Sequence, residues 1–232
     1  LPGCAMVLVF VYIPVIANCV YSFFRLSSYS AGMKFVGLDN YIRFFHNESL
    51  GIMLRNNLLY CVISLIVQVG FGTVIALLLE SKLASSRFRN AFRNIYYVPA
   101  LISLTAVGLM FTFIYEPNLG LLNSAFKALG LTSMTQSWLG DSKIAIYCII
   151  AMSQWQYTGY ITLLMVVAFQ NVSPDYIEAA SIDGAGPVRR AISVVLPLAK
   201  EQLLVCSIIT VIGAFKLFTE VYSTTAGGPG NS

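Results

Sequence analysis

Long uncharged stretches divide this chain into apolar segments joined by polar connectors. Uncharged stretches cover residues 1–24, 56–79, 94–115 and 144–174, and a shorter one over 202–215 stays apolar as far as Tyr222. A helix of about 20 apolar residues crosses the roughly 30 Å hydrocarbon layer of a membrane. We therefore predict an all-α polytopic membrane protein that forms a single domain over residues 1–232. Its five predicted spans cover about residues 3–24, 57–79, 95–115, 144–169 and 202–222.

The connectors differ from one another in charge and in turn content. Residues 25–55 are polar, residues 80–93 are short and basic, and residues 116–143 are rich in turn-forming Gly, Pro and Asn. Five spans place the 80–93 and 175–201 connectors on the same side of the membrane. The dense basic charge of residues 80–93 weakly favours the cytoplasmic side.

Composition agrees with the segment pattern. Apolar residues make up 57% of the chain and charged residues only 10%, and the mean hydropathy is +0.76; a soluble domain has roughly 25% charged residues. The net charge of +4 is spread over the connectors, with no basic block that would favour nucleic acid. All five cysteines lie in apolar runs and are interpreted as small buried hydrophobic residues.

Sequence motifs for catalysis and for nucleotide binding are absent. The chain contains no G-x-x-x-x-G-K-[ST] phosphate loop and no G-x-S-x-G nucleophile motif. Its single histidine, His46, has no neighbouring Cys or carboxylate cluster and is interpreted as a connector residue. Within the predicted spans only Lys216 and Glu220 carry charge. These absences argue against an enzyme and mildly against an ion-coupled secondary transporter.

The connector at residues 173–199 has complete helix punctuation. Ser173 is a good N-cap, and Pro174 suits the first helical position because its missing N–H needs no partner there. The helix is predicted to run to about Ile182 or Asp183, where Gly184 and the following Gly-Pro pair end it. A second short helix is predicted over residues 188–195.

The surface of the first of these helices is suited to close contact. Glu178 and Ile182 lie one turn apart on one face, and the small side chains of Ala179 and Ala180 keep that surface low. We therefore predict a short helix at the membrane surface that docks into another protein, rather than a simple connecting loop.

The segment "EAASIDGAGPVRRAISVVLPL" resembles the EAA motif of binding-protein-dependent ABC importer permeases, closest to the maltose and glycerol-phosphate type. Shorter pieces agree along the chain: "FVGLDNY" at 35–41, "NNLLY" at 56–60, "FRNIYYVPALIS" at 92–103, "LGLLN" at 119–123, "WLGD" at 138–141 and "TAGGPG" at 225–230. Each piece is weak alone, but their order together with the EAA segment is specific.

This resemblance implies a six-helix permease core in a bacterial or archaeal cell membrane, with the EAA loop on the cytoplasmic side. It also implies three kinds of partner: a second permease, two ATPase subunits and an external solute-binding protein. ATP and Mg²⁺ are then expected on the ATPases, with no cofactor on this chain. The residues that match the motif, and that we expect to couple to the ATPase, are Glu178, Ala179, Ala180, Asp183, Gly184 and Gly186. The family continues into a last span, so we expect roughly 20 more apolar residues beyond Ser232.

A polar solute would need polar and aromatic side chains along its path. The candidates are Gln154, Trp155, Gln156 and Tyr157 in the fourth predicted span, and Phe215, Phe218 and Glu220 in the fifth. Helix packing and an interfacial aromatic belt are the alternative explanation for these residues. The two glutamines favour a path, because an amide that faces lipid is costly.

The sequence therefore predicts the membrane-spanning permease subunit of an ATP-driven importer that takes up a sugar or a related polar solute. One alternative is the same architecture for glycerol phosphate or another solute such as an oligopeptide. The other is a secondary transporter or scaffold whose 175–201 connector has no partner.

Overall fold

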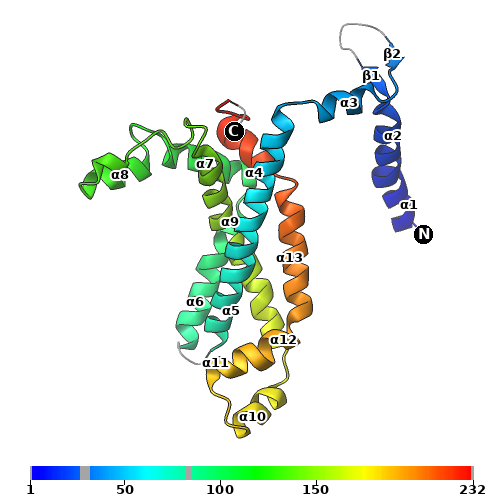
Figure 1. The fold of residues 1–232 in the computed structure, drawn as a ribbon. Helices are drawn as coiled ribbons and strands as arrows, with labels where there is room; N and C mark the ends of the chain where they lie inside the picture. Colours follow the sequence, from blue (N-terminus) through cyan, green and yellow to red (C-terminus); the bar gives the residue numbers. More distant parts are fainter. Residues whose placement is uncertain (1, 27–31, 82–84, 231–232) are drawn as a thin grey trace. The chain divides into compact units, whose positions relative to one another are not determined.

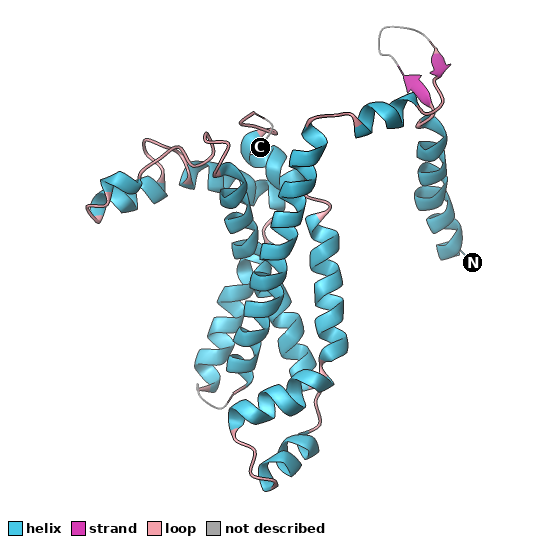
Figure 2. Cartoon of the chain, in the orientation of Figure 1, coloured by secondary structure: helices cyan, strands magenta, loops and turns pink. Residues whose placement is uncertain are grey.

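The computed structural model describes residues 2–26, 32–81 and 85–230. The chain divides into two compact units, Leu1–Met53 and Leu54–Ser232, each of which is described by itself. Helices form nearly all of the regular structure in the described residues (Figure 2). The predicted all-α fold is therefore confirmed, apart from one short hairpin.

The first unit begins with a helix of 20 residues, Pro2–Tyr21, that is long and apolar enough to cross a membrane. It consists of α1 (Pro2–Val7), the π-helical turn η1 (Leu8–Tyr12) and α2 (Ile13–Tyr21). None of its residues is buried. Cys4 and Cys19 are therefore exposed, so the prediction that all five cysteines are buried holds only for Cys61, Cys148 and Cys206.

A two-stranded antiparallel hairpin follows this helix. Strand β1 (Phe24–Leu26) pairs with β2 (Met33–Phe35), with Phe24 opposite Phe35 and Arg25 opposite Lys34. The predicted span over residues 3–24 is thus too long at its end, because Phe24 already belongs to a strand. The lack of charge up to residue 24 marks apolar composition and does not mark the end of the helix.

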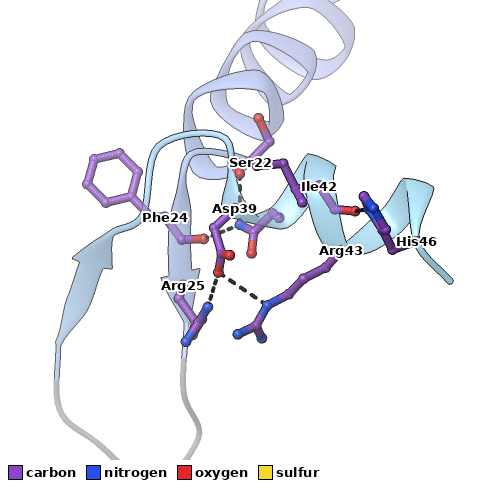
Figure 3. A network of polar contacts seen from close by, with 8 residues as sticks. Ser22, Phe24, Arg25, Asp39, Ile42, Arg43 and His46 are labelled. Carbon is purple, nitrogen blue, oxygen red and sulfur yellow. Dashed lines mark hydrogen bonds and ion pairs between the residues drawn. The ribbon is translucent and has the colours of Figure 1, made fainter.

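An ion-pair cluster joins the hairpin to helix α3 (Asp39–Phe45) in the predicted polar connector (Figure 3). The Asp39 carboxylate accepts from the guanidinium of Arg25 and, at 3.2 Å, from Nε of Arg43. All three side chains are substantially exposed, so each pair contributes little stability. Their role is local, since they fix the direction in which α3 leaves the hairpin.

Hydrogen bonds hold two more polar residues of this connector, Asn40 and His46. The amide of Asn40 donates to the carbonyl oxygens of Ser22, at 2.8 Å, and of Phe24, at 3.0 Å. His46 caps the end of α3, and its Nδ1 lies 2.8 Å from the Ile42 carbonyl oxygen (Figure 3). This contact gives the single histidine a structural role.

A continuous helix of 32 residues, Ser49–Glu80, leads into the second unit and also passes the length and apolarity test for a span. It comprises α4 (Ser49–Ser64), the π-helical segment η2 (Leu65–Phe71) and α5 (Gly72–Glu80). The predicted span covered residues 57–79. The helix starts earlier, at Ser49, because a helix can carry charged residues such as Arg55 outside the apolar layer.

The third predicted span is broken in the structure. The basic connector and the apolar stretch after it form α6 (Ser86–Tyr97), the 3₁₀ turn η3 (Val98–Leu101) and α7 (Leu104–Ile114). The helical stretches Arg89–Leu101 and Leu104–Ile114 are bent by 97° relative to each other at the break between them. Pro99 lacks an N–H for helix continuation, and Ser103 starts a new helix by accepting from the N–H of Ala106 at 3.4 Å. Residues 86–93 are therefore helical rather than a loop.

The fourth predicted span corresponds to helix α9 (Ala145–Gln170), within one residue at each end. Among the described residues, two helices are long and apolar enough to cross a membrane, or four segments if each of two bent pairs forms one span. Helix α9 is not among these segments. Its centre carries polar side chains, including Ser153, Gln154 and Gln156, and most of its residues on that stretch face other helices.

The fifth predicted span, residues 202–222, is two helices. Helix α13 (Lys200–Ala214) is separated by a turn from α14 (Thr219–Thr225). Helix α13 also forms a pair bent by 70° with the preceding helical stretch Pro187–Leu198. The charged Lys216 and Glu220 thus lie at and after a helix break and not in the middle of a span.

Helix α9 lies at the centre of the second unit and packs against α5, α6, α7, α13 and α14 (Figure 1). The main core cluster includes Val69, Ile161, Met165 and Cys206. A Cβ on Gly72 would lie 3.1 Å from the Thr162 hydroxyl, so this glycine permits the close approach of α5 and α9.

The buried side chain of Asn123 links several parts of the predicted turn-rich connector, which contains α8 (Leu121–Ala128). Asn123 is 1% exposed, and its amide nitrogen donates to the carbonyl oxygens of Pro117 and Gln136, each at 2.9 Å. Its amide oxygen accepts from the indole N–H of Trp138 at 2.8 Å. These bonds give a physical reason for the "LGLLN" and "WLGD" pieces, whose Asn and Trp meet here.

Candidate functional site

The segment at residues 173–199 forms the helical hairpin that its punctuation predicts. Helix α10 (Pro174–Ile182) begins with the Ser173 side chain accepting from the N–H of Asp175 at 3.3 Å. The hairpin continues into α11 (Pro187–Arg190), η5 (Ala191–Val195) and α12 (Leu196–Leu198). In Figure 1 it lies at the end of the second unit where α5 ends and α6 begins, opposite α8. This agrees with the predicted placement of the two connectors on one side.

The turn between α10 and α11 depends on a glycine. Gly184 has φ +78°, a left-handed conformation that side chains with a Cβ rarely adopt. The N–H of Ala185 donates to the Ala180 carbonyl at 2.9 Å, which closes the end of α10. The guanidinium of Arg190 then donates to the Ser181 hydroxyl and ties the two short helices together. The hairpin therefore has a defined turn and a hydrogen bond that links its two short helices.

The outer surface of this hairpin presents unpaired apolar and acidic groups. Ile182 is 86% exposed and Val188 is 70% exposed, and Tyr176 is also exposed. Glu178 and Asp183 form no ion pair among the described residues. Exposed apolar side chains next to a free carboxylate are typical of a surface that another protein covers.

Replacing Gly184 by Val is expected to abolish most transport without removing the protein from the membrane. The positive φ costs a β-branched residue about 1–3 kcal/mol, so the turn would open and α10 would lose its orientation. Uptake and the amount of membrane-inserted protein are the two measurements. The matched control is Gly51→Ala in α4, where a Cβ meets nothing within 4 Å. Normal uptake by Gly184→Val would show that the turn geometry does not matter.

The second unit also contains a cavity of about 460 Å³, a volume typical of small-molecule sites. Several helices contribute to its wall: α4, η2, α6, η3, α7, α9, α13 and α14. Four tyrosines line it, namely Tyr60, Tyr97, Tyr157 and Tyr160. The other polar wall residues are Gln68, Thr210, Lys216 and Glu220.

Two polar atoms on this wall lack partners. Thr210 and Glu220 are 5% and 6% exposed, yet Oγ1 of Thr210 and Oε2 of Glu220 have no hydrogen-bond partner among the described residues. Buried polar groups are nearly always hydrogen-bonded, so such atoms call for a ligand, water or another chain. Tyr60 differs, because its hydroxyl pairs with the buried Ser153 hydroxyl. The cavity thus combines aromatic faces with free hydrogen-bonding capacity.

Of the seven residues predicted along a solute path, Tyr157 and Glu220 lie on this cavity wall. Gln156 is 2% exposed and donates from Nε2 to the Ile102 carbonyl oxygen at 3.1 Å. This bond gives a partner to a backbone carbonyl at the break before α7. Gln154 donates to the Ser64 hydroxyl at 3.0 Å and so joins α9 to α4. Each amide nitrogen thus bonds to a neighbouring helical segment, whereas Oε1 of each has no hydrogen-bond partner among the described residues.

The three remaining aromatic residues lie away from this cavity. Trp155 packs against Phe111, with ring centroids 5.4 Å apart, and lines a separate, mainly apolar pocket of about 400 Å³ together with Gln154. Phe215 and Phe218 are exposed, and Phe218 stacks on Tyr222. The structure therefore brings two of the seven predicted residues together and gives the others packing or surface positions.

Six polar wall residues were not among the predicted site residues: Tyr60, Gln68, Tyr97, Tyr160, Thr210 and Lys216. Gln68 carried the same signal as Gln154, an amide inside an apolar stretch. The tyrosines carried no signal of their own, since an aromatic belt explains them equally well.

Comparisons with known proteins agree with the fold and the hairpin. Residues 68–232 match the family described as "Binding-protein-dependent transport system inner membrane component". The chain is 42% identical over 225 residues to the probable ABC transporter permease protein YurN of Bacillus subtilis, covering 97% of this chain and 77% of that protein. It is 32% identical to the trehalose/maltose transport system permease protein MalF of Thermococcus litoralis, covering 100% of this chain and 77% of that protein.

A further relative and a solved structure complete the comparison. The arabinooligosaccharides transport system permease protein AraP of Bacillus subtilis is 32% identical, over 93% of this chain and 67% of that protein. The crystal structure of a bacterial ABC transporter that imports the acidic polysaccharide alginate has the same fold, with a TM-score of 0.79 at 21% identity over 97% of this chain and 77% of that one. The EAA-type hairpin, the helical bundle and these matches show that the chain belongs to the family of binding-protein-dependent transport system inner membrane components, the permeases of ABC transporters.

Proposed function

We propose that this chain translocates a sugar as one of two permease subunits of an ATP-driven importer. The observation that carries the proposal is the tyrosine-lined cavity of about 460 Å³, with the free hydrogen-bonding atoms of Thr210 and Glu220. Sugars present hydroxyl groups for such atoms and apolar ring faces for tyrosines. The names of relatives for trehalose/maltose and arabinooligosaccharides support a sugar over glycerol phosphate or a peptide.

In this proposal the partners are a second permease, two ATPase subunits and an extracytoplasmic solute-binding protein, at the cytoplasmic membrane of a bacterium or archaeon. ATP and Mg²⁺ belong to the ATPase subunits, and this chain binds no cofactor and catalyses no reaction. The coupling residues are Glu178, Ala179, Ala180, Asp183, Gly184 and Gly186. The hairpin that carries them is suited to transmit movement, because it leads directly into α13.

The transport step then follows from the connectivity. Closure of the ATPases on ATP moves the α10–α12 hairpin, and α13 moves with it because only a sharp bend separates the two. Helix α13 contributes Thr210 to the cavity wall and is followed by Lys216 and Glu220. Movement of the hairpin therefore changes the shape of the cavity and its access for a sugar.

Replacing Tyr157 by Ala tests the cavity. We expect solute uptake to fall about tenfold, the scale of losing one aromatic contact and one hydrogen bond, while the ATPase activity without solute stays normal. The matched control is Tyr147→Ala, a tyrosine of the same helix that is 49% exposed and lies off the cavity wall. Equal uptake by the two variants would show that this cavity is not part of the solute path.

Co-purification tests the class of transporter. Affinity purification of this chain from its native membrane should bring an ATPase subunit and a second permease with it. A chain that purifies alone and still transports solute would favour a secondary transporter.

A further inference from the structure

We infer that Glu220 makes the cavity selective for the charge of its solute, favouring sugars with only hydroxyl or amino groups over sugars that carry carboxylates. This inference rests on the proposed function, since it concerns the same cavity. It goes beyond it by naming the residue that decides between two chemical classes of sugar.

The position of Glu220 is the first ground. It lies in the first turn of α14, directly after the break that follows α13, and it is 6% exposed. Its side chain lines the cavity, and Oε2 has no hydrogen-bond partner among the described residues. A buried carboxyl oxygen without a partner is costly, so a group inside the cavity is the expected partner of Oε2.

The chemistry of that partner is limited. An ionised carboxylate only accepts hydrogen bonds, so it needs hydroxyl, N–H or ammonium donors. A sugar hydroxyl supplies a donor, and an amino sugar supplies a donor with opposite charge. A uronate carboxylate supplies neither and brings a like charge, which is strongly unfavourable in a desolvated site.

Lys216 is the one group on the described cavity wall that could reverse this preference. It lies in the turn between α13 and α14, but it is exposed and forms no ion pair with Glu220 within the 4 Å limit for such a contact. An exposed ammonium on a flexible stem is screened by water and salt, whereas a buried charge is screened much less. The buried carboxyl group should therefore dominate the selectivity.

The test measures sugar binding to the complete purified transporter without its solute-binding protein, so that only the permease cavity discriminates. The probes are neutral oligosaccharides (maltotriose, arabinotriose and N,N′-diacetylchitobiose) and the acidic di- and trigalacturonates, followed by isothermal titration calorimetry. We expect the best neutral probe to bind wild type at least about tenfold more tightly than either galacturonate. Glu220→Gln keeps an acceptor but removes the charge, so the preference should shrink by about the same factor.

Three further variants and three outcomes make the test decisive. Glu220→Asp should keep the preference because it keeps the charge, and Glu220→Ala removes the charge if Glu220→Gln does not assemble. Lys216→Gln should not reduce the preference for neutral sugars. Unchanged preference in Glu220→Gln, or equal binding of galacturonate by wild type, would overturn the inference while leaving sugar transport in place. If wild type bound no sugar of either class, the proposed function itself would fail, and the inference with it.

Discussion

The Glu178→Lys variant is expected to reach the membrane at normal levels and to transport no solute. Glu178 lies on the exposed face of α10 and has no ion-pair partner among the described residues, so its charge is available to a partner protein. A carboxylate that is desolvated against a basic group in an interface contributes strongly, and breaking such a pair costs about 2–5 kcal/mol. Charge reversal adds repulsion to that loss.

The measurements for Glu178→Lys are solute uptake, the amount of inserted permease and the amount of ATPase that co-purifies with it. Helix α10 itself should survive, because its N-cap at Ser173 and its terminal Gly184 turn are unchanged. The matched control is Glu48→Lys, the same charge reversal at an exposed residue of the first unit without an ion pair in the described structure. Normal uptake by a well-expressed Glu178→Lys variant would exclude Glu178 from the coupling contact.

The α10–α12 hairpin could be predicted from the sequence because its signals are local. Ser173 and Pro174 start the helix, and Gly184 ends it, each through hydrogen bonds or backbone angles within a few residues. Such signals do not depend on what the rest of the chain does. The same held for α9, whose ends lie within one residue of the predicted span.

The ends of the other helices could not be read from the charge pattern alone. An uncharged stretch shows which residues can lie in lipid. Where a helix begins, continues or breaks depends instead on backbone hydrogen bonds and on residues such as proline. Ser49 begins a helix well before the apolar stretch because Asn47 accepts from its N–H at 2.9 Å. Pro99 and Ser103 break the third predicted span inside an uncharged stretch. The proline and the serine were visible in the sequence, but the absence of charge alone predicted one continuous span.

The cavity depended on tertiary structure that no local pattern contains. Tyr60 and Tyr157 meet across helices that are nearly a hundred residues apart in the chain, and Thr210 comes from a third helix. Polar residues in apolar stretches correctly indicated buried contacts. They did not indicate which residues those contacts would join. Gln154 and Gln156 donate from their amide nitrogens to neighbouring segments while Oε1 of each has no partner among the described residues, and Glu220 and Thr210 keep unpaired atoms at the cavity.

Replacing Gly159 by Ala is expected to destabilise the whole second unit. Gly159 lies in α9 where α6 crosses it, and a Cβ there would be 2.0 Å from the Tyr96 carbonyl oxygen and 2.8 Å from its carbonyl carbon. Both are backbone atoms, so no side-chain rotation relieves the clash and α6 must move away from α9. Overpacking of this kind costs at least about 1–3 kcal/mol, more than the roughly 1 kcal/mol that Ala gains over Gly in a helix.

Thermal unfolding and protease resistance of the purified transporter measure this effect, with Gly70→Ala as the control. A Cβ on the exposed Gly70 has only the Leu65 carbonyl oxygen nearby, at an ordinary 3.7 Å, so this variant should be as stable as wild type or more so. Movement of α6 also displaces Tyr97, the next residue after Tyr96 and a part of the cavity wall. Any Gly159→Ala protein that still folds should therefore lose uptake beyond what its lower amount explains. A Gly159→Ala transporter with wild-type unfolding temperature and uptake would contradict the close crossing of α6 and α9.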